Sequence, residues 1–336
     1  MKWYQQTGPE GDAVISSRVR LARNLAEYPF PCRMNQAQRQ EVNEKARQAL
    51  SETDEGQFEY IEMQKLTPAR AMSLAERHLI SPEFARERQG RALLLGQDEQ
   101  MSIMLGEEDH IRIQAMSAGL SLDSALDAAW KLDDRLDDKL HFAFDERLGY
   151  LTQCPTNLGT GLRASLMLFL PAAAQTGAMR NLAVAVGKLG LTIRGTYGEG
   201  SQARGAFFQI SNQVTLGVTE HEAVNNLVAV AGQIIHQERS LRENLKGRSP
   251  QLEDRIFRSW GILRHARLLS ADEFMERISD VRLGVVMGMI QPVGLESVDA
   301  LLWEVQPATL MANAGRSLDA AARDALRARM VRERLK

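Results

Sequence analysis

The chain has 336 residues, of which 44% are hydrophobic, and this is enough to fill the core of one large domain or two ordinary ones. Its formal net charge of −2 excludes a global electrostatic field for nucleic acid or an anionic membrane, so any anion site has to be built locally. The two cysteines, Cys32 and Cys154, exclude a disulfide framework and a cysteine-based zinc site. With no apolar segment long enough for a signal or an anchor, we expect a cytoplasmic protein without membrane partners.

In chain order, the first clear elements are three short β-favouring runs at 90–96, 101–106 and 110–116, which predict an antiparallel meander. An amphipathic helix is predicted over 121–142, where leucines recur at three- and four-residue steps. The elements predicted next are a helix from about Arg163, a helix at 178–188, and strands at 149–155, 191–195 and 206–217. This mixture is typical of an α+β fold with an antiparallel sheet flanked by helices.

From about Glu220 onward the β signal disappears and only helical periodicity remains. We therefore expect a sheet-containing domain at 1–222 and an all-helical C-terminal domain at 223–336. Residues 316–336 hold seven basic and three acidic side chains, and such a charged terminal helix is usually a solvated face.

Two arginines, Arg18 and Arg20, stand two residues apart in the segment ISSRVRLARN. A strand would point both guanidinium groups to the same side, which is unfavourable unless an anion lies between them. Polyphosphate fits best, because guanidinium groups bind phosphate oxygens bidentately. A solvated edge strand explains the same pattern.

Two further segments carry charges in turns or loops. GEEDHIRIQ at 106–114 places three consecutive carboxylates before His110 and Arg112, which suits either a cationic substrate or an ordinary acidic turn. RGTYGEGSQARG at 194–205 contains four glycines, so that its central Glu199 would reach a substrate as the loop closes. A flexible hairpin loop with one exposed glutamate is the alternative.

The segment CPTNLGTGLRAS at 154–165 combines a cysteine, a glycine-containing turn and Arg163. It lacks the lysine and hydroxyl of a P-loop, and it does not match the dinucleotide-binding fingerprint. A strand, a tight turn and a helix from Arg163 would still present backbone N–H groups to an anion. Cys154 by itself is more often a small buried hydrophobe than a catalyst.

Taken in order, the motifs S-x-R-x-R, E-E-D-H-[IL]-R, C-P-T-N-L-G-T-x-x-R-A-S, R-G-x-x-G-E and I-S-N resemble the catalytic domain of the phosphagen (guanidino) kinases. The resemblance spans about residues 14–220. Five longer segments are similar in sequence to the bacterial protein-arginine kinases of the McsB type. They are SSRVRLARN, RHLISP, GEEDHIRIQ, RGTYGEGSQARGAFFQISNQ and RDALRA. Those enzymes lack the N-terminal helical domain of the phosphagen kinases and add a helical C-terminal one.

The resemblance implies specific roles, with ATP and Mg²⁺ as cofactors and no metal held by side chains. Glu108 and Glu199 would hold the substrate guanidinium, and Cys154 would be the reactive cysteine beside it. The residues implied for ATP are Ser16, Ser17, Arg18, Val19, Arg20, His78, Arg112, Arg163, Ala164, Ser165, Leu166, Met167, Arg194, Gly195, Thr196, Tyr197, Gly198 and Glu199. The RDALRA motif implies an allosteric phosphoarginine site formed by Arg323, Asp324, Arg327 and Ala328.

The function implied is ATP-dependent phosphorylation of arginine side chains in proteins. The resemblance also implies a homodimer, an activator protein, marking of proteins for a Clp-type protease, and control of a stress repressor. Two alternatives remain open: a kinase for free arginine or another small guanidine, and a non-catalytic adaptor that binds phosphoarginine.

Overall fold

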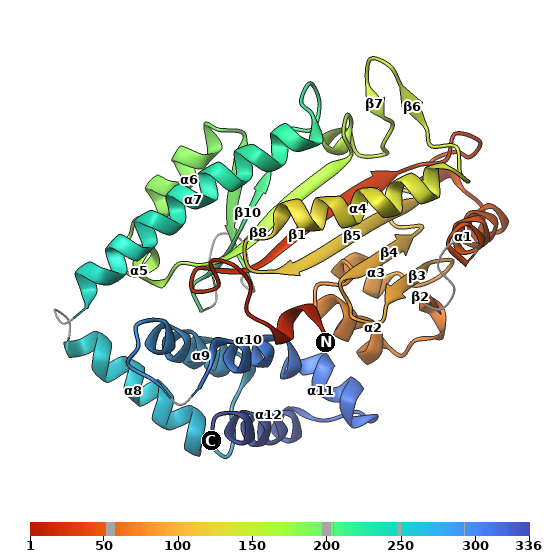
Figure 1. Ribbon diagram of the computed structural model, residues 1–336. Helices are drawn as coiled ribbons and strands as arrows, with labels where there is room; N and C mark the ends of the chain where they lie inside the picture. Colours follow the sequence, from red (N-terminus) through yellow and green to blue (C-terminus); the bar gives the residue numbers. More distant parts are fainter. Residues whose placement is uncertain (52–57, 197–202, 204, 247–249, 292) are drawn as a thin grey trace.

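The computed structural model describes residues 1–51, 58–196, 203, 205–246, 250–291 and 293–336 (Figure 1). Its centre is an eight-stranded antiparallel sheet in the order β2-β3-β4-β5-β1-β8-β10-β9. The strands are β1 (Val14–Arg23), β2 (Phe58–Glu62), β3 (Ala92–Gly96), β4 (Met101–Leu105), β5 (Ile111–Ala118), β8 (Leu162–Phe169), β9 (Leu191–Gly195) and β10 (Phe207–Asn212). A small hairpin of β6 (Phe144–Asp145) and β7 (Gly149–Tyr150) stands apart from this sheet.

Helices cover the sheet and form the C-terminal region. Those of the first part are α1 (Gln36–Ser51), α2 (Pro68–Glu76), α3 (Pro82–Arg86), α4 (Leu122–Asp137), α5 (Pro171–Gln175), α6 (Met179–Gly187) and α7 (Glu220–Leu245). The C-terminal helices are α8 (Pro250–His265), α9 (Ala271–Val286), α10 (Leu295–Glu304), α11 (Pro307–Ala314) and α12 (Ala320–Arg334). The structure thus confirms the predicted α+β fold and the predicted antiparallel meander, which is formed by β3, β4 and β5.

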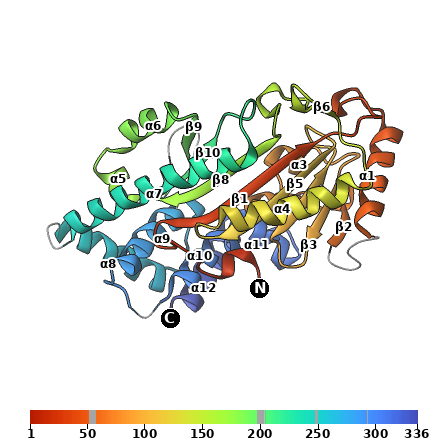
Figure 2. The same cartoon turned by 45° about the horizontal axis from the view of Figure 1, so that its top comes forward.

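One face of the sheet is apolar and covered by α4 and α7, which lie across it (Figure 2). The strands supply alternate residues to this core, including Val19 and Leu21 from β1 and Ala164 and Leu166 from β8. Because strand side chains alternate between faces, the intervening positions point to the other side of the sheet. The opposite face is therefore free to carry polar side chains.

The predicted helix from Arg163 is wrong, because residues 162–169 form β8. Leu162, Ala164, Leu166 and Leu168 enter the core under α7, while Met167 and Phe169 enter a second core on the other face. A strand covered on both faces reads as a nearly continuous apolar run, which a sequence pattern does not distinguish from a buried helix.

The packing groups α7 with the sheet, in contrast to the expected boundary at residue 222. Val224, Leu227 and Ile234 of α7 belong to the same core as the strands. Helices α8 to α12 surround a separate core, to which the sheet contributes Phe169 and Phe207. The change of packing falls between α7 and α8, so we propose the domain boundary there. Helical periodicity predicts a helix but does not say which partner covers its apolar side.

A buried ion pair fixes α7 to the sheet. The fully buried Glu238 accepts hydrogen bonds from the backbone N–H groups of Ala172 at 3.0 Å and Ala173 at 2.9 Å, and from Arg242 Nε at 2.7 Å. Arg242 also donates to the carbonyl oxygen of Phe169 at 2.9 Å. One carboxylate therefore caps α5 and orients the guanidinium that holds the end of β8.

Replacing Glu238 by alanine is expected to lower the free energy of unfolding by about 3 kcal/mol, because Arg242 and two amides would lose their buried acceptor. Glu243 is exposed on the same helix and provides the matched control. Glu243→Ala should stay within about 0.5 kcal/mol of the wild type. Chemical denaturation followed by circular dichroism measures both, and equal stabilities would contradict the role assigned to Glu238.

Candidate active site

A cleft of about 990 Å³ opens on the polar face of the sheet. Arg18 and Arg20 of β1 both line it, as their spacing predicted. In the strand register Arg20 lies opposite Gln114 of β5 and Arg163 of β8, and these two side chains line the cleft as well. With Arg112 of β5, the central strands therefore bring four arginines to one surface.

The two β1 arginines lie deep in this cleft. Arg18 donates to Ser165 Oγ at 3.2 Å and to Gln209 Oε1 at 3.0 Å, whereas the buried Nε of Arg20 has no hydrogen-bond partner. Burial, reinforced by the charge of Arg112, lowers the pKa of Arg18 to about 10. Burial and the neighbouring Arg18 also lower the pKa of Arg20. Within the described residues no carboxylate forms an ion pair with either group, so the cleft suits a polyanionic ligand such as a polyphosphate.

The three consecutive carboxylates of the acidic turn have different surroundings. Glu107 is 7% exposed, forms an ion pair with Arg112 and accepts a hydrogen bond from Ser81. Glu108 is 40% exposed and accepts from Arg112 Nη2 at 3.0 Å. Glu107 thus anchors Arg112, while Glu108 keeps an open side toward the solvent.

The third carboxylate connects the acidic turn to the loop before Cys154. Asp109 accepts from Asn24 Nδ2 at 2.7 Å and from the backbone N–H of Gln153 at 2.8 Å. Burial raises the pKa of this carboxyl, and the two hydrogen bonds oppose that effect. Asp109 therefore has a structural role that holds Glu108 and Cys154 in one part of the site.

A smaller pocket of about 200 Å³ adjoins the cleft. Cys154, Thr156 and Asn157 line it, with Cys154 Sγ 3.1 Å from Thr156 Oγ1. Both cavities share four side chains, namely Arg20, Glu108, Arg112 and Arg163. The arginines therefore form the wall between a large chamber and a small one that contains a carboxylate and a thiol.

The glycines that follow Cys154 are required by close packing of the backbone. Gly159 has a φ of +108°, and a Cβ there would lie 2.1 Å from the carbonyl oxygen of Thr215. Gly161 has a φ of +64°, and a Cβ there would lie 2.6 Å from the carbonyl oxygen of Ala22. These residues seat the loop against β1 and the segment after β10. The glycines of this turn therefore serve the packing of the backbone. The positive charge that faces the cleft comes from Arg163, which follows the turn.

Arg163 connects this loop to β10. Its guanidinium donates to the carbonyl oxygen of Asn212 at 2.8 Å and to Asn157 Oδ1 at 3.4 Å. Burial lowers the pKa of Arg163, and the nearby Cys154 opposes that change. The structure thus brings Arg163 next to Cys154, as the motif suggested.

Several residues of the expected ATP set do not face the cleft. Val19, Ala164 and Leu166 lie in the core on the opposite face, because they alternate with the cleft residues along β1 and β8. Ser17 also lies on that face, where its Oγ donates to the carbonyl oxygen of Gly119. Ser16 and Met167 are buried, and Met167 belongs to the core of the C-terminal helices.

At the sheet edge, Arg194, Gly195 and Thr196 line the cleft from β9. Tyr197, Gly198 and Glu199 lie outside the described residues, so the prediction for Glu199 stays a prediction. Gln114 and Gln209 are among the cleft residues that sequence reasoning missed. The alternation of side chains along a strand could have found both. Gln114 of β5 and Gln209 of β10 each lie on the polar face of a strand that pairs with an arginine-bearing strand, β1 or β8.

His78 forms another part of the cleft wall, with a φ of +61°. Its ring packs edge-on against Trp303 of α10, with ring centroids 4.8 Å apart. Burial lowers the pKa of His78 to about 3, and the charges of Arg18 and Arg20 act in the same direction. The ring is therefore neutral near pH 7 and offers an uncharged surface beside the arginines.

The RDALRA motif lies on α12 in the C-terminal region. Arg327 is 1% exposed and donates to the carbonyl oxygens of Val305 at 3.0 Å and Leu269 at 2.7 Å, and to Asp324 Oδ1 at 2.7 Å. Arg323 is only partly buried and donates to the carbonyl oxygen of Leu318 at 3.5 Å. The structure brings these side chains together, with Arg327 and Asp324 paired to each other.

A wall of arginines between a large cleft and a small pocket suits the transfer of a phosphoryl group, because that reaction requires positioning and charge neutralisation. Residues 41–241 match the family model described as ATP:guanido phosphotransferase, C-terminal catalytic domain. Residues 249–336 match the model described as protein-arginine kinase McsB C-terminal domain. The chain therefore belongs to the ATP:guanido phosphotransferase family, which uses ATP, and it is a transferase.

Similar proteins cover nearly the whole chain. A protein-arginine kinase of Geobacillus sp. (strain WCH70) is 46% identical over 99% of this chain and 93% of its own length. One from Brevibacillus brevis is 46% identical over 99% of this chain and 95% of its own length. These relatives confirm the resemblance that the motifs indicated.

Solved structures share the fold of the catalytic part. The duplicated taurocyamine kinase of Schistosoma mansoni superimposes with a TM-score of 0.63 at 27% identity, covering 75% of this chain and 37% of that longer chain. A lombricine kinase gives a TM-score of 0.63 at 26% identity, covering 71% of this chain and 69% of its own. Among the described helices, none has the length and apolar character that crossing a bilayer requires.

The low pKa of His78 predicts a pH-dependent contribution to stability. Between about pH 6.5 and 3 the unfolded chain binds a proton that the folded chain does not, so folding becomes less favourable as the pH falls. His78→Asn removes this titration, and asparagine tolerates a positive φ. The stability advantage of the wild type over the variant should shrink by about 2 kcal/mol between pH 8 and pH 5. Urea denaturation at both pH values measures it, and a constant difference would contradict the assignment.

Proposed function

We propose that this enzyme transfers the γ-phosphoryl group of ATP to arginine side chains of proteins. The observation that carries the proposal is the arginine wall shared by the cleft and the smaller pocket. The nucleotide would occupy the cleft, with its phosphates against Arg18, Arg20, Arg112 and Arg163 and its base toward the neutral ring of His78. The target guanidinium would enter the pocket that contains Glu108 and Cys154.

Charge neutralisation and alignment are the main requirements of phosphoryl transfer. Arg18 and Arg20 meet the first requirement, because they lie deep in the cleft without a carboxylate partner among the described residues. The described residues contain no group of three or more side chains able to hold a metal ion. Mg²⁺ would be held mainly by the phosphate oxygens of the nucleotide and would supply further charge neutralisation there.

The acceptor must lose a proton, because a guanidinium has no lone pair available for attack. Glu108 reaches into the pocket and would take that proton as the nitrogen–phosphorus bond forms. The bond from the γ-phosphorus to its bridging oxygen breaks at the same time, and this oxygen leaves with ADP. Cys154 would stabilise the positive acceptor from the other side of the pocket, and Glu199 is proposed as a second carboxylate.

Protein arginine is proposed as the acceptor because relatives named protein-arginine kinase match this chain at 46% identity over nearly its full length. The structures named for small guanidines match at 26–27% identity and lack coverage of the whole chain. The proposal has further parts. The protein would be a cytoplasmic homodimer with an activator protein as partner, and it would mark proteins for a Clp-type protease and control a stress repressor. The location is proposed from the composition of the chain, and the other parts are proposed from the resemblance.

Incubation with MgATP and a denatured protein should produce phosphoarginine, detected by mass spectrometry under non-acidic conditions. Glu108→Gln should lower kcat by about a hundredfold, because the proton acceptor is lost. Cys154→Ser should slow turnover and raise the pH optimum without abolishing ATP binding. Cys32→Ser is the matched control for the loss of a thiol and should keep the wild-type pH optimum, because Cys32 does not line the pocket proposed for the acceptor.

Three results would contradict the proposal. Phosphate only on serine, threonine or tyrosine would exclude arginine as the acceptor. Phosphate on free arginine but not on protein would favour the small-guanidine alternative. Full function of Glu108→Gln and Cys154→Ser would favour the non-catalytic adaptor.

The RDALRA motif is proposed as a site for phosphoarginine, with the phosphate at Arg323 and Arg327 and the ligand guanidinium at Asp324. Asp324 would then exchange its pairing with Arg327 for the ligand. Arg323→Gln should weaken phosphoarginine binding by about tenfold, since a charged hydrogen bond is lost. Arg329→Gln, an exposed arginine on the same helix, should bind as the wild type does. Calorimetry with free phosphoarginine measures both, and equal affinities would contradict the site.

A further inference from the structure

Exposed apolar side chains flank the loop that carries Cys154. On one side, the β6–β7 hairpin presents Phe144, which is 59% exposed, and Leu148, which is 43% exposed. On the other side, the segment after β10 presents Val214 at 46% and Leu216 at 49% exposure. We call these four residues the apolar rim. They make up four of the nine large hydrophobic side chains that are exposed within the described residues.

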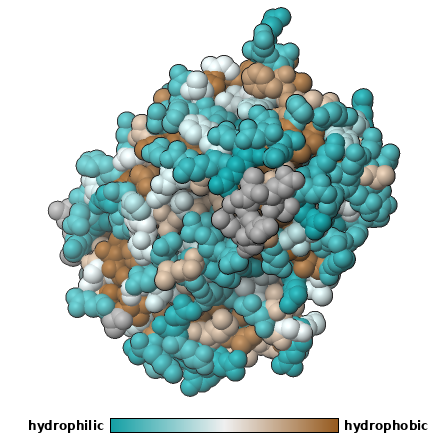
Figure 3. Space-filling view, turned by 45° about the vertical axis from the view of Figure 1, so that its right-hand side comes forward, coloured by the Kyte–Doolittle hydropathy of each residue, from teal (hydrophilic) through white to brown (hydrophobic). Residues whose placement is uncertain are grey.

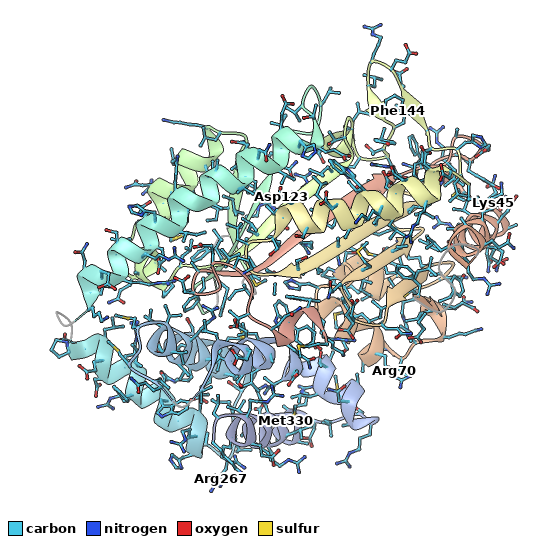
Figure 4. All side chains as sticks on the ribbon, in the orientation of Figure 1. Lys45, Arg70, Asp123, Phe144, Arg267 and Met330 are labelled. Carbon is cyan, nitrogen blue, oxygen red and sulfur yellow. The ribbon has the colours of Figure 1, made fainter. Side chains whose placement is uncertain are left out.

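The hairpin is attached directly to the Cys154 loop. The backbone N–H of Tyr150 donates to the carbonyl oxygen of Gly159 at 2.8 Å, and the Phe144 and Tyr150 rings pack edge-on, with centroids 5.2 Å apart. The hairpin protrudes from the body of the molecule, and Figure 4 places Phe144 on it. Figure 3 shows apolar surface below the tip of this protrusion.

The base of the hairpin is held by a buried arginine. Arg23 stacks on the ring of Tyr150, with its Cζ 3.4 Å from the ring centroid, and donates to the carbonyl oxygen of Thr160 at 3.0 Å. The same guanidinium pairs with Asp133 at 2.7 Å. The hairpin and the Cys154 loop therefore share one anchor, which keeps this side of the rim in a fixed position relative to the pocket.

The second side of the rim is attached to the same loop. The backbone N–H of Thr160 donates to the carbonyl oxygen of Thr215 at 2.9 Å. Thr215 Oγ1 in turn donates to the carbonyl oxygen of Leu158 at 2.8 Å. Thr215 is buried, so the backbone of this segment is held in place, while the side chains of its neighbours Val214 and Leu216 are exposed.

We propose that the apolar rim binds the polypeptide on both sides of the target arginine. The inference rests on the proposed function and adds a sequence preference at that site, namely apolar residues beside the target arginine. A target arginine with its guanidinium in the pocket brings its neighbours, about 3.3 Å apart along an extended chain, over the surrounding surface. Folded proteins bury most large apolar side chains, so such segments become available mainly on unfolding.

The occupant is argued from continuity with the acceptor pocket. Both rim segments bond to the loop that supplies Cys154, Thr156 and Asn157 to that pocket. An apolar surface at this place is covered whenever a polypeptide substrate is bound. A second copy of the chain on the rim is the competing outcome of the test.

The test compares two synthetic peptides, each with a single arginine, flanked either by leucine and phenylalanine or by serine and glycine. Formation of phosphoarginine is measured as kcat and KM. The wild type should show a KM about tenfold lower for the apolar peptide. The double variant F144S/L148S should raise that KM toward the value for the polar peptide, with kcat and the kinetics of the polar peptide unchanged.

A second double variant, V214S/L216S, tests the other side of the rim and keeps the proposal falsifiable if the hairpin variant misfolds. The matched control is F257S/L268S, which replaces two similarly exposed side chains, 45% and 62%, in the C-terminal region and should behave as the wild type. Light scattering gives the oligomeric state of each variant.

Equal KM values of the wild type for the two peptides would overturn the proposal. Equal losses on both peptides in the rim variants would overturn it in favour of a structural role. A change of oligomeric state with unchanged kinetics would assign the rim to a second copy of the chain. Failure of the proposed function is distinct, because the wild type would then phosphorylate arginine in neither peptide.

Discussion

The site depends on two neighbouring guanidinium groups held deep on the central strand of the sheet. β1 is hydrogen-bonded to β5 on one side and to β8 on the other, so Arg18 and Arg20 cannot move away from each other by bending an edge. Burial lowers the pKa of both, which shows that the fold disfavours their charge when no anion is present. The sheet holds the two groups close together, and under the proposed function the phosphates of the nucleotide would offset their repulsion.

The acidic turn shows how one short segment divides structural and chemical roles. Three adjacent carboxylates look equivalent in the sequence, yet each has different partners. Glu107 is fixed by Ser81 and Arg112, and Asp109 by Asn24 and the backbone of Gln153. Glu108 alone of the three keeps an exposed side chain at the pocket. Because these partners come from distant parts of the chain, no local pattern could have distinguished the roles.

Periodicity predicted the fold where one face of an element is buried and the other is not. The meander of β3, β4 and β5 and the helix α4 follow that rule, as do the parallel directions of Arg18 and Arg20. Periodicity failed for β8, which is apolar on both faces and was predicted as a helix. The contiguous ATP motifs were misleading for the same physical reason, since alternate residues such as Val19 and Ala164 enter the opposite core.

Contacts between the sheet-containing part and the C-terminal helices lay beyond any sequence pattern, and they change the view of the helical region. Trp303 packs against His78, and Glu76 accepts the N-terminal amides of α11 at Ala308 and Thr309 at 2.8 and 2.7 Å. Arg327 of α12 holds the carbonyl oxygen of Val305, in the short connection between those two contacts. His78 in the cleft wall and Arg327 of the RDALRA motif therefore both contact one packed segment, residues 303–309. A ligand that drew Arg327 away from Val305 would act on the packing behind His78, so the helical region supports one residue of the cleft wall, although the residues that line the cleft all lie between Arg18 and Gln213.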